Sequence, residues 1–263
     1  MIGAIIGDIS GSRFERNNIK TKDFELLNDK CLFTDDSVMS LAICEALMRS
    51  RRNFTQLSEQ AAVCMQEIGR PYTDCGYGGY FYQWMYSDNP KPYNSFGNGA
   101  AMRVSGCGYA ASSAEEAELL SKQVTEVTHN HPEGIKGAKA TAVAVFLARS
   151  GRNILEIRDY IDKYYYSMNF TLASIRDEYT FDVTCQGSVP QALTAFFEST
   201  SFEDAIRNAI SIGGDSDTIA AITGGVAEAY YGVPIDLREQ ALTFLDERLL
   251  KILLDFERLY PPK

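Results

Sequence analysis

Apolar residues recur every three to four positions along most of the chain, which is the spacing of one face of an α-helix. In residues 35–49, for example, Val38 and Leu41 share one such face. Ser113 and Ser201 stand directly before two further periodic segments, where a serine caps a helix. Beyond residues 35–49, the pattern predicts helices over 113–124, 136–149, 154–168, 190–198, 202–212, 218–231 and 236–260, the last as one helix or two.

The alternation typical of a β-strand is scarce and is limited to a short stretch near residues 179–183. Gly3, Gly7 and Gly11 recur every four residues, so they would share one face of a helix. Small residues on one face favour close packing against a second helix. No repeat or linker divides the chain. The sequence therefore predicts one all-α domain over residues 1–263, a compact arrangement of many orthogonally packed helices.

Composition agrees with a globular chain: 263 residues, 45% hydrophobic and 23% charged. The 35 acidic residues outnumber the 25 basic ones and give a net charge of −10, which excludes nucleic acid as a broad partner. No apolar run reaches the ~20 residues of a membrane span, and the first residues do not resemble a signal peptide. The six cysteines are scattered, which favours reduced thiols over a zinc finger or disulfide scaffold. We expect a cytoplasmic monomer that needs no membrane.

Two acidic motifs stand at the starts of predicted apolar helices: FTDDS at residues 33–37 and GGDSDT at residues 213–218. Either motif alone is typical of a helix cap, because early carboxylates complement the helix dipole. Together they supply four aspartates and two hydroxyl groups. Two such helix ends facing each other would form a dense cage of oxygen atoms.

That cage suits Mg²⁺ or Mn²⁺, which prefer carboxylate, hydroxyl and water ligands. Without a cation, clustered carboxylates repel one another and their pKa values rise. Two ions about 3.5–4 Å apart would neutralise the carboxylates and lower the pKa of a shared water molecule. The two motifs therefore predict a hydrolase with a dinuclear metal site.

Two other kinds of metal site fit the sequence less well. Phosphatases of the haloacid dehalogenase type use D-x-D-x-[TV] after a hydrophobic strand, whereas here Thr218 stands one position early and two glycines precede the acids. His129 and His131 match the H-x-H motif of amidohydrolases. Those sites recruit further histidines, and this chain has no others. The dehalogenase type is rejected, and the amidohydrolase type is disfavoured.

A glycine-rich segment, NSFGNGAAMR at residues 94–103, lies between a turn and a helix of small residues. Its backbone N–H groups would hold a phosphate group without lysine or arginine, although a plain loop-to-helix junction has the same composition. His129 and His131 share one short connection before Pro132. A neutral His129 ring would donate a hydrogen bond to a phosphate or a ribose, and a structural role is the alternative.

The motifs GDISGSRFE, FTDDS, SFGNGAAMR, THNHPEG and GGDSDTIAAITGGVAEAYYG follow one another in this order over residues 2 to about 232. In this order they closely resemble the ADP-ribosylglycohydrolase family, which includes dinitrogenase reductase-activating glycohydrolases and ADP-ribosyl-acceptor hydrolases. The resemblance implies an all-helical fold. It also implies a dinuclear Mg²⁺ or Mn²⁺ site that removes ADP-ribose from modified side chains.

The resemblance also implies roles for individual residues. Glu15 matches a glutamate on a mobile loop near the metals, where it gates the site or transfers protons; with Asp35 and Asp36 it completes the catalytic set. Phe96 stands where an aromatic ring stacks on adenine. The metal ligands implied are Thr34, Asp35, Asp36, Asp215, Asp217 and Thr218. The residues implied to bind ADP-ribose are Ser95, Phe96, Gly97, Asn98, Gly99 and His129.

The resemblance leaves the acceptor of the ADP-ribose open. Ser37 and Ser216 replace threonines that are frequent in the family, and both keep a hydroxyl group. The chain is compact for the family, so short acceptor-binding loops are expected. ADP-ribosyl-arginine is the first expectation, with Asp74 or Asp88 as an extra acid for the guanidinium. O-linked ADP-ribose, on serine or in O-acetyl-ADP-ribose, is the alternative. A non-catalytic ADP-ribose-binding protein would have eroded metal ligands, and these are intact.

The expected reaction is hydrolysis at C1″ of the distal ribose, whose 2″- and 3″-hydroxyls would bind the metals. Loss of the acceptor builds oxocarbenium character at C1″, as in other glycosidic cleavages. Asp35, Asp36 or Glu15 would activate the attacking water, and one of these acids would protonate the leaving group. The partner is thus an ADP-ribosylated protein or small molecule.

Overall fold

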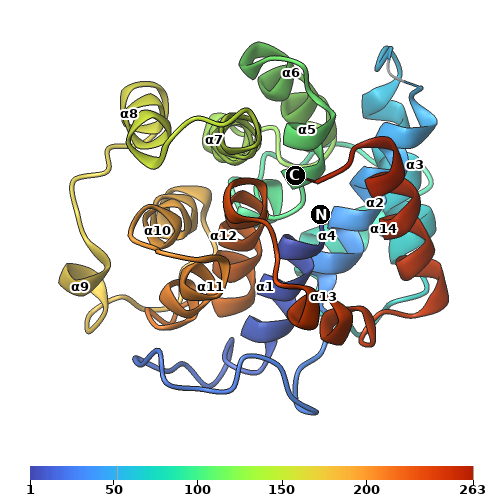
Figure 1. Ribbon diagram of the computed structural model, residues 1–263. Helices are drawn as coiled ribbons and strands as arrows, with labels where there is room; N and C mark the ends of the chain where they lie inside the picture. Colours follow the sequence, from blue (N-terminus) through green and yellow to red (C-terminus); the bar gives the residue numbers. More distant parts are fainter. Residues whose placement is uncertain (52, 263) are drawn as a thin grey trace.

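The computed structural model describes residues 1–51 and 53–262, which are mainly helical, with long loops between some of the helices (Figure 1). The described part contains fourteen α-helices and one 3-10 helix, η1 (Asn98–Ala100), and holds no strand. The predicted all-α fold is confirmed. The helices are α1 (Ile2–Ser12), α2 (Asp35–Arg49), α3 (Leu57–Gly69), α4 (Gly79–Tyr86), α5 (Ser105–Ala110), α6 (Ala114–Thr125), α7 (Pro132–Arg149), α8 (Ile154–Tyr164), α9 (Leu172–Ile175), α10 (Cys185–Phe197), α11 (Phe202–Ile210), α12 (Ser216–Tyr231), α13 (Ile235–Leu242) and α14 (Glu247–Leu259).

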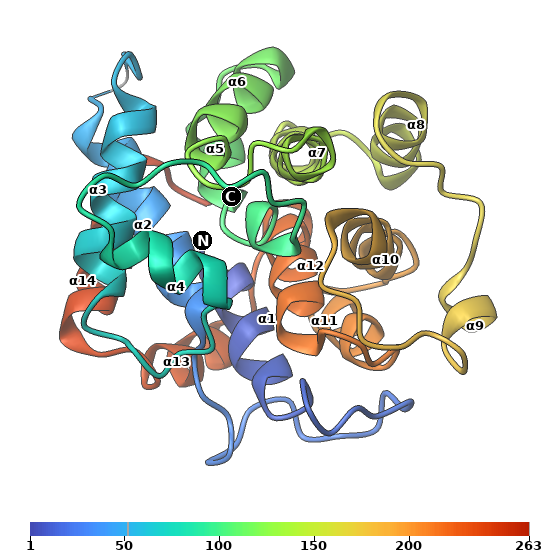
Figure 2. The same ribbon diagram turned by 180° about the vertical axis from the view of Figure 1, so that it is seen from behind.

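Helices α1 and α12 lie side by side in the middle of the molecule (Figures 1 and 2). The glycine face of α1 makes this contact possible. A Cβ atom on Gly7 would stand 2.0 Å from the carbonyl oxygen of Ala220, and one on Gly11 would stand 2.5 Å from the Cα of Asp217. The predicted close packing is confirmed. It brings the C-terminal end of α1 against the first turn of α12.

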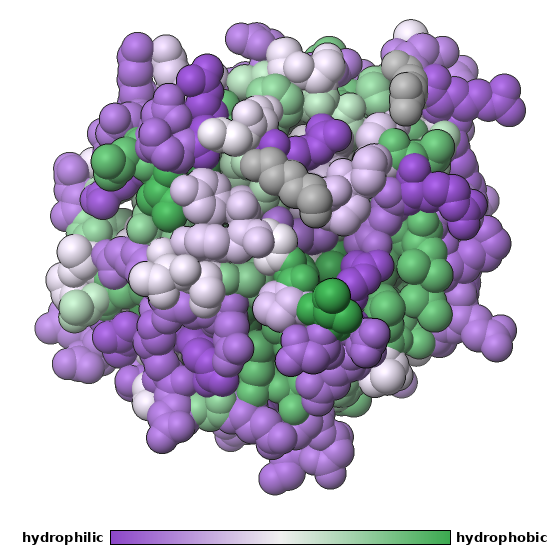
Figure 3. Space-filling model, viewed as in Figure 1, coloured by the Kyte–Doolittle hydropathy of each residue, from purple (hydrophilic) through white to green (hydrophobic). Residues whose placement is uncertain are grey.

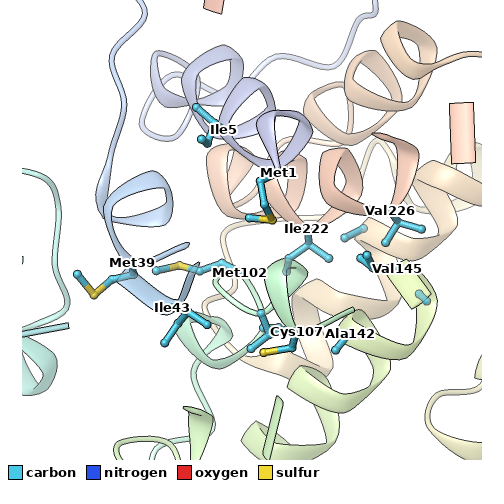
Figure 4. Packing of buried hydrophobic residues seen from close by; sticks show 14 of the residues in the cluster. Met1, Ile5, Met39, Ile43, Met102, Cys107, Ala142, Val145, Ile222 and Val226 are labelled. Carbon is cyan, nitrogen blue, oxygen red and sulfur yellow. The ribbon is translucent and has the colours of Figure 1, made fainter. Parts of the chain in front are cut away.

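Buried side chains of five helices meet around this pair (Figure 4). Ile5 of α1, Ile43 of α2 and Ile222 of α12 are completely buried. Cys107 of α5 and Val145 of α7 join them and are equally inaccessible to water. The free energy gained by burying these apolar groups therefore fixes α2 and α12 relative to α1.

Several helix ends follow from local capping. Helix α2 begins and ends where the sequence predicts, with the Thr34 side chain accepting a hydrogen bond from the backbone N–H of Asp36. The segment 236–260 forms two helices, and the Asp246 side chain caps the second. Helix α10 begins at Cys185, five residues before the predicted start, because Thr184 caps it and Pro190 lies inside it. Helix α8 ends at Tyr164 and not at residue 168.

The stretch near residues 179–183 does not form the strand that its alternation suggested. It is an extended segment that pairs with the glycine-rich loop through a single bridge between Gly97 and Thr184. The backbone N–H of Asn98 donates to the carbonyl of Val183 at 2.7 Å, and that of Cys185 donates to the carbonyl of Phe96 at 2.9 Å. A strand needs a partner of several residues, and this loop supplies only a short contact.

Polar residues cover most of the face seen in Figure 3, where apolar residues show in separate patches. Within the described ranges, no helix combines the length and apolar character that a membrane crossing requires. Figure 2 shows α4 and the chain that leads from it to η1 on the side opposite to the view of Figure 1.

Gly7→Ala is expected to lower the free energy of unfolding by about 3 kcal/mol, as overpacking of a rigid contact does. The added methyl group would meet the carbonyl oxygen of Ala220 at 2.0 Å, and relief of this clash requires the two helix backbones to separate. Urea unfolding measures the loss. Gly79→Ala is the matched control, since among the described residues no atom outside its own helix backbone and chain neighbours lies within 4 Å of the added Cβ. Equal losses for the two variants would show that the α1–α12 contact is not tight.

Candidate active site

The carboxylate of Asp8 is completely buried although it belongs to α1, a helix with an apolar sequence. It accepts hydrogen bonds from the backbone N–H groups of Thr34 at 2.9 Å and Ser37 at 3.0 Å, and from both side-chain hydroxyls. These bonds fasten the N-terminus of α2 to α1. Sequence reasoning did not assign Asp8 to the site. The available signal was a single carboxylate inside the apolar run of residues 2–9.

Asp36 and Asp217 complete a buried cluster with Asp8. One carboxylate oxygen from each of the three lies within 4.8 Å of the others. Asp36 is 2% exposed and Asp217 is 4% exposed. Thr218 Oγ1 donates to Asp36 Oδ2 at 3.1 Å, whereas Asp36 Oδ1 is buried and has no hydrogen-bond partner among the described residues. An unpartnered buried carboxylate oxygen beside two further carboxylates fits a divalent cation.

Asp215 stands at the start of α12, after Gly213 and Gly214, whose φ values of 71° and 77° turn the chain into the helix. Asn98 Nδ2 donates to Asp215 Oδ2 at 2.6 Å and so ties this carboxylate to the glycine-rich loop. Asp35 begins α2, and its backbone N–H donates to the carbonyl of Cys75 at 2.8 Å. The two predicted acidic motifs therefore meet at facing helix N-termini.

Burial and mutual repulsion raise the pKa values of these carboxyl groups. Burial raises the pKa of Asp8 to about 6, and hydrogen bonds from Ser37 and Thr34 limit the rise. Burial, with Asp8 and Asp215 nearby, raises the pKa of Asp35 to about 8. The pKa values of Asp36 and Asp217 rise well above the ordinary range, first through burial and then through neighbouring aspartates. Positive charge at this point would relieve the repulsion.

Glu15 follows α1 at the rim of the cluster and is partly exposed. Its Oε1 atom forms an ion pair with Arg16 at 3.0 Å. Burial raises the pKa of Glu15, the Arg16 charge lowers it and Asp215 raises it. The Arg16 guanidinium also lies 5.4 Å from the centre of the Phe181 ring. A half-buried carboxyl group with a raised pKa is suited to proton transfer.

A cavity of about 720 Å³ opens beside the carboxylate cluster, a size typical of small-molecule sites. Sequence reasoning did not include the segment 76–79 at the start of α4, Tyr93, Met102 or Arg103, which also line it. Of the two extra acids considered, Asp74 lines the cavity and Asp88 does not. The predicted residues that line it are Glu15, Thr34, Asp35, Asp36, Ser95, Gly97, Asn98, Gly99, His129, Asp215, Asp217 and Thr218.

Phe96 is the one predicted site residue outside this lining. Its side chain is 43% exposed and its ring packs edge-on against His131, with the ring centres 5.2 Å apart. The neighbouring residues of the loop do face the cavity: the Ser95 hydroxyl accepts from the backbone N–H of Gly97 at 3.1 Å. Stacking of Phe96 on adenine stays a prediction.

An all-helical protein with clustered aspartates at facing helix N-termini and a ligand-sized cavity has the form of a metal-dependent hydrolase. The sequence profile of the family described as ADP-ribosylglycohydrolase matches residues 1–260. This chain belongs to the ADP-ribosylglycohydrolase family and is a hydrolase.

Relatives with known names are distant. ADP-ribosylhydrolase ARH3 of Homo sapiens is 26% identical over an alignment of 309 positions, gaps included, that covers 89% of this chain and 84% of that protein. ADP-ribosylhydrolase ARH3 of Xenopus tropicalis is 25% identical, with 94% and 91% covered. A solved structure titled "ADP-ribosylglycohydrolase-related protein complex" has the same fold, with a TM-score of 0.70, 20% identity, and 98% of this chain and 95% of that chain covered.

We expect Mn²⁺ to stabilise the chain more at pH 8 than at pH 5. Folding raises the pKa of Asp8 to about 6 and of Asp35 to about 8, so without metal these groups lower the stability as the pH rises from about 4 to 8. Because the cation needs ionised ligands, it competes with protons at pH 5. Its binding therefore stabilises the folded chain most at pH 8.

The measurement is the melting temperature with and without 1 mM MnCl₂, which at roughly 100 times a Kd of about 10 μM would stabilise the chain by about 2.7 kcal/mol. Asp217→Asn should reduce the Mn²⁺-induced rise at both pH values. A rise that is equal at pH 5 and pH 8, or unchanged in Asp217→Asn, would contradict the proposed metal centre.

Proposed function

We propose that this chain hydrolyses the bond between C1″ of the distal ribose of ADP-ribose and an acceptor group, with the help of two divalent cations, Mg²⁺ or Mn²⁺. The observation that carries the proposal is the buried Asp8–Asp36–Asp217 cluster, with its unpartnered Asp36 Oδ1, beside a cavity of about 720 Å³. Membership of the family supports the same substrate class.

The proposed ligands of the cations lie on two helix starts that the core fixes in place. Asp8 sits behind them and holds Thr34 and Ser37, so it sets the position of the α2 residues. When bound, the cations would neutralise the carboxylates and supply a nucleophilic water near neutral pH. The residues that would hold them are Thr34, Asp35, Asp36, Asp215, Asp217 and Thr218.

Other residues of the cavity would handle the sugar and the proton. Departure of the acceptor leaves positive charge on the ribose, and Asp35, Asp36 or Glu15 would activate the water that attacks C1″. Glu15 would transfer a proton through Oε2, since its Oε1 is paired with Arg16. The Asn98 amide keeps Asp215 in place at 2.6 Å. The segment 95–99 and the His129 ring would hold the rest of ADP-ribose.

Charges on the cavity wall favour an oxygen-linked acceptor such as ADP-ribosyl-serine. Four basic and six acidic residues line the cavity, so two bound divalent cations would leave its wall with a net positive charge. This charge would repel a guanidinium leaving group, whereas a serine hydroxyl is neutral. The position of Asp74 on the same wall favours ADP-ribosyl-arginine, which is the second candidate.

A product assay separates the two acceptors. With 1 mM MnCl₂, roughly the concentration used above, we expect the chain to release ADP-ribose from a serine-modified peptide at least about tenfold faster than from an arginine-modified one, a difference of about 1.4 kcal/mol. Faster release from the arginine peptide would establish the second candidate. Release from neither peptide, nor from O-acetyl-ADP-ribose, would contradict the proposed function.

Asp36→Asn should lower kcat by roughly 10³-fold or more, as loss of an essential catalytic group does. The amide keeps the shape of the side chain but cannot supply the carboxylate that the unpartnered Oδ1 offers. Helicity measured by circular dichroism should not change. Asp88→Asn is the matched control, because Asp88 is exposed and outside the cavity. Activity of Asp36→Asn within tenfold of the unaltered chain would exclude Asp36 from the reaction.

A further inference from the structure

Arg103 is a buried cation without a carboxylate partner in the residues described. Its side chain is 1% exposed, and it lines the cavity. Nη2 donates to Thr128 Oγ1 at 2.5 Å and lies 3.4 Å from His129 Nδ1. Nε is buried and has no hydrogen-bond partner within residues 1–51 and 53–262. Burying a lone guanidinium costs free energy, so a role beyond packing is called for.

The hydrogen bonds around Thr128 fix the protonation of His129. A guanidinium only donates, so Thr128 Oγ1 accepts from Arg103 and has one proton of its own to give. That proton points to His129 Nδ1 at 2.7 Å, since the alternative acceptor, the Thr125 carbonyl, is more distant at 3.3 Å. A hydrogen on Nδ1 would lie against the cationic Nη2 of Arg103, 3.4 Å from Nδ1, which can only donate, whereas an unprotonated Nδ1 accepts from Thr128. Nδ1 therefore accepts, and the proton of the neutral ring lies on Nε2.

The Nε2 atom of His129 faces the glycine-rich wall of the cavity. A Cβ atom on Gly99 would stand 3.3 Å from Nε2, and one on Gly97 would stand 3.6 Å away. Neither position carries a side chain, so a ligand atom has access to the N–H. Burial, and secondly the Arg103 charge, lower the pKa of His129 well below its ordinary value. The ring therefore stays neutral near pH 7.

We propose that Arg103 and Thr128 are positioning residues that hold His129 as a neutral ring with its Nε2–H directed at a phosphate oxygen of the bound ligand. This inference rests on the proposed function for the identity of the ligand, ADP-ribose, but not for the state of the ring. The Arg103 charge acts through Thr128 and His129, and in a buried site it offsets the negative charge of the diphosphate without touching it.

Nitrogen NMR of the metal-free full chain with ¹⁵N-labelled histidine tests the ring directly at pH 7. The chain has only two histidines, and His131→Gln assigns the signals. We expect His129 to carry its proton on Nε2 and to have an unprotonated Nδ1. A proton on Nδ1, or an imidazolium ring, would overturn the inference whatever the chain hydrolyses.

Two variants test the positioning. Thr128→Val should move the Nδ1 resonance, because this nitrogen loses its hydroxyl donor, and should weaken ADP-ribose binding about tenfold in calorimetry. Arg103→Met, once circular dichroism shows that it is folded, should populate the Nδ1–H form. Thr141→Val is the matched control, since Thr141 is a buried threonine whose hydroxyl has no partner among the described residues.

An unchanged Nδ1 resonance in Thr128→Val, unchanged ADP-ribose binding in that variant, or equal effects from Thr141→Val would each contradict the positioning role. If Arg103→Met does not fold, Thr128→Val decides the question alone. Failure of the unaltered chain to bind ADP-ribose would overturn the proposed function and the ligand part of this inference. The ring measurement would still decide whether His129 is held as described.

Discussion

The contact between the glycine face of α1 and the start of α12 is the constraint on which the rest of the site depends. A Cβ atom at Gly7 would stand 2.0 Å from a backbone oxygen of α12, so the two helices approach as closely as backbones can. The same approach places Asp8 of α1 within reach of Asp217 of α12. Asp8 in turn holds the first turn of α2 through Thr34 and Ser37. One packing contact thus positions residues from three helices.

The cluster that results is costly without a cation. Burial raises the pKa of Asp8 to about 6, and burial together with the neighbouring aspartates raises the pKa of Asp35 to about 8. The surrounding donors only partly compensate, because Asp36 Oδ1 has no partner among the described residues. Part of the net charge of −10 is therefore concentrated in this one cluster of carboxylates. Ionised carboxylates at this density are stable in a core when divalent cations bind between them.

The fold was largely predictable from the sequence, because long amphipathic segments determine helices by their own periodicity. Helix α2 has the predicted bounds, and its capping residue Thr34 is visible in the sequence. The two acidic motifs could also be found in the sequence, because their aspartates are adjacent in the chain and enter the site together. The start of α10 was missed because Pro190 reads as a helix start although it lies inside one.

Sequence reasoning missed those site residues whose role depends on distant partners. Asp8 resembles an interruption of an apolar helix until α2 and α12 surround it. Arg103 ends a glycine-rich motif. Only the tertiary structure shows that it is buried beside Thr128 and His129 and has no carboxylate partner in the described part of the chain. The direction of a side chain also depends on tertiary contacts that the sequence does not reveal. Phe96 belongs to the predicted loop, yet its ring packs on His131 outside the cavity lining.

The central claim is that the α1–α2–α12 junction binds divalent cations as a pair. Electron paramagnetic resonance of the full chain titrated with Mn²⁺ tests it most directly, because it counts bound ions and detects magnetic coupling between neighbours. The account predicts two bound Mn²⁺ per chain with a coupled signal at a separation of about 3.5–4 Å. It also predicts that Asp36→Asn abolishes the coupling. Uncoupled Mn²⁺ only, or no tightly bound ion, would contradict the account.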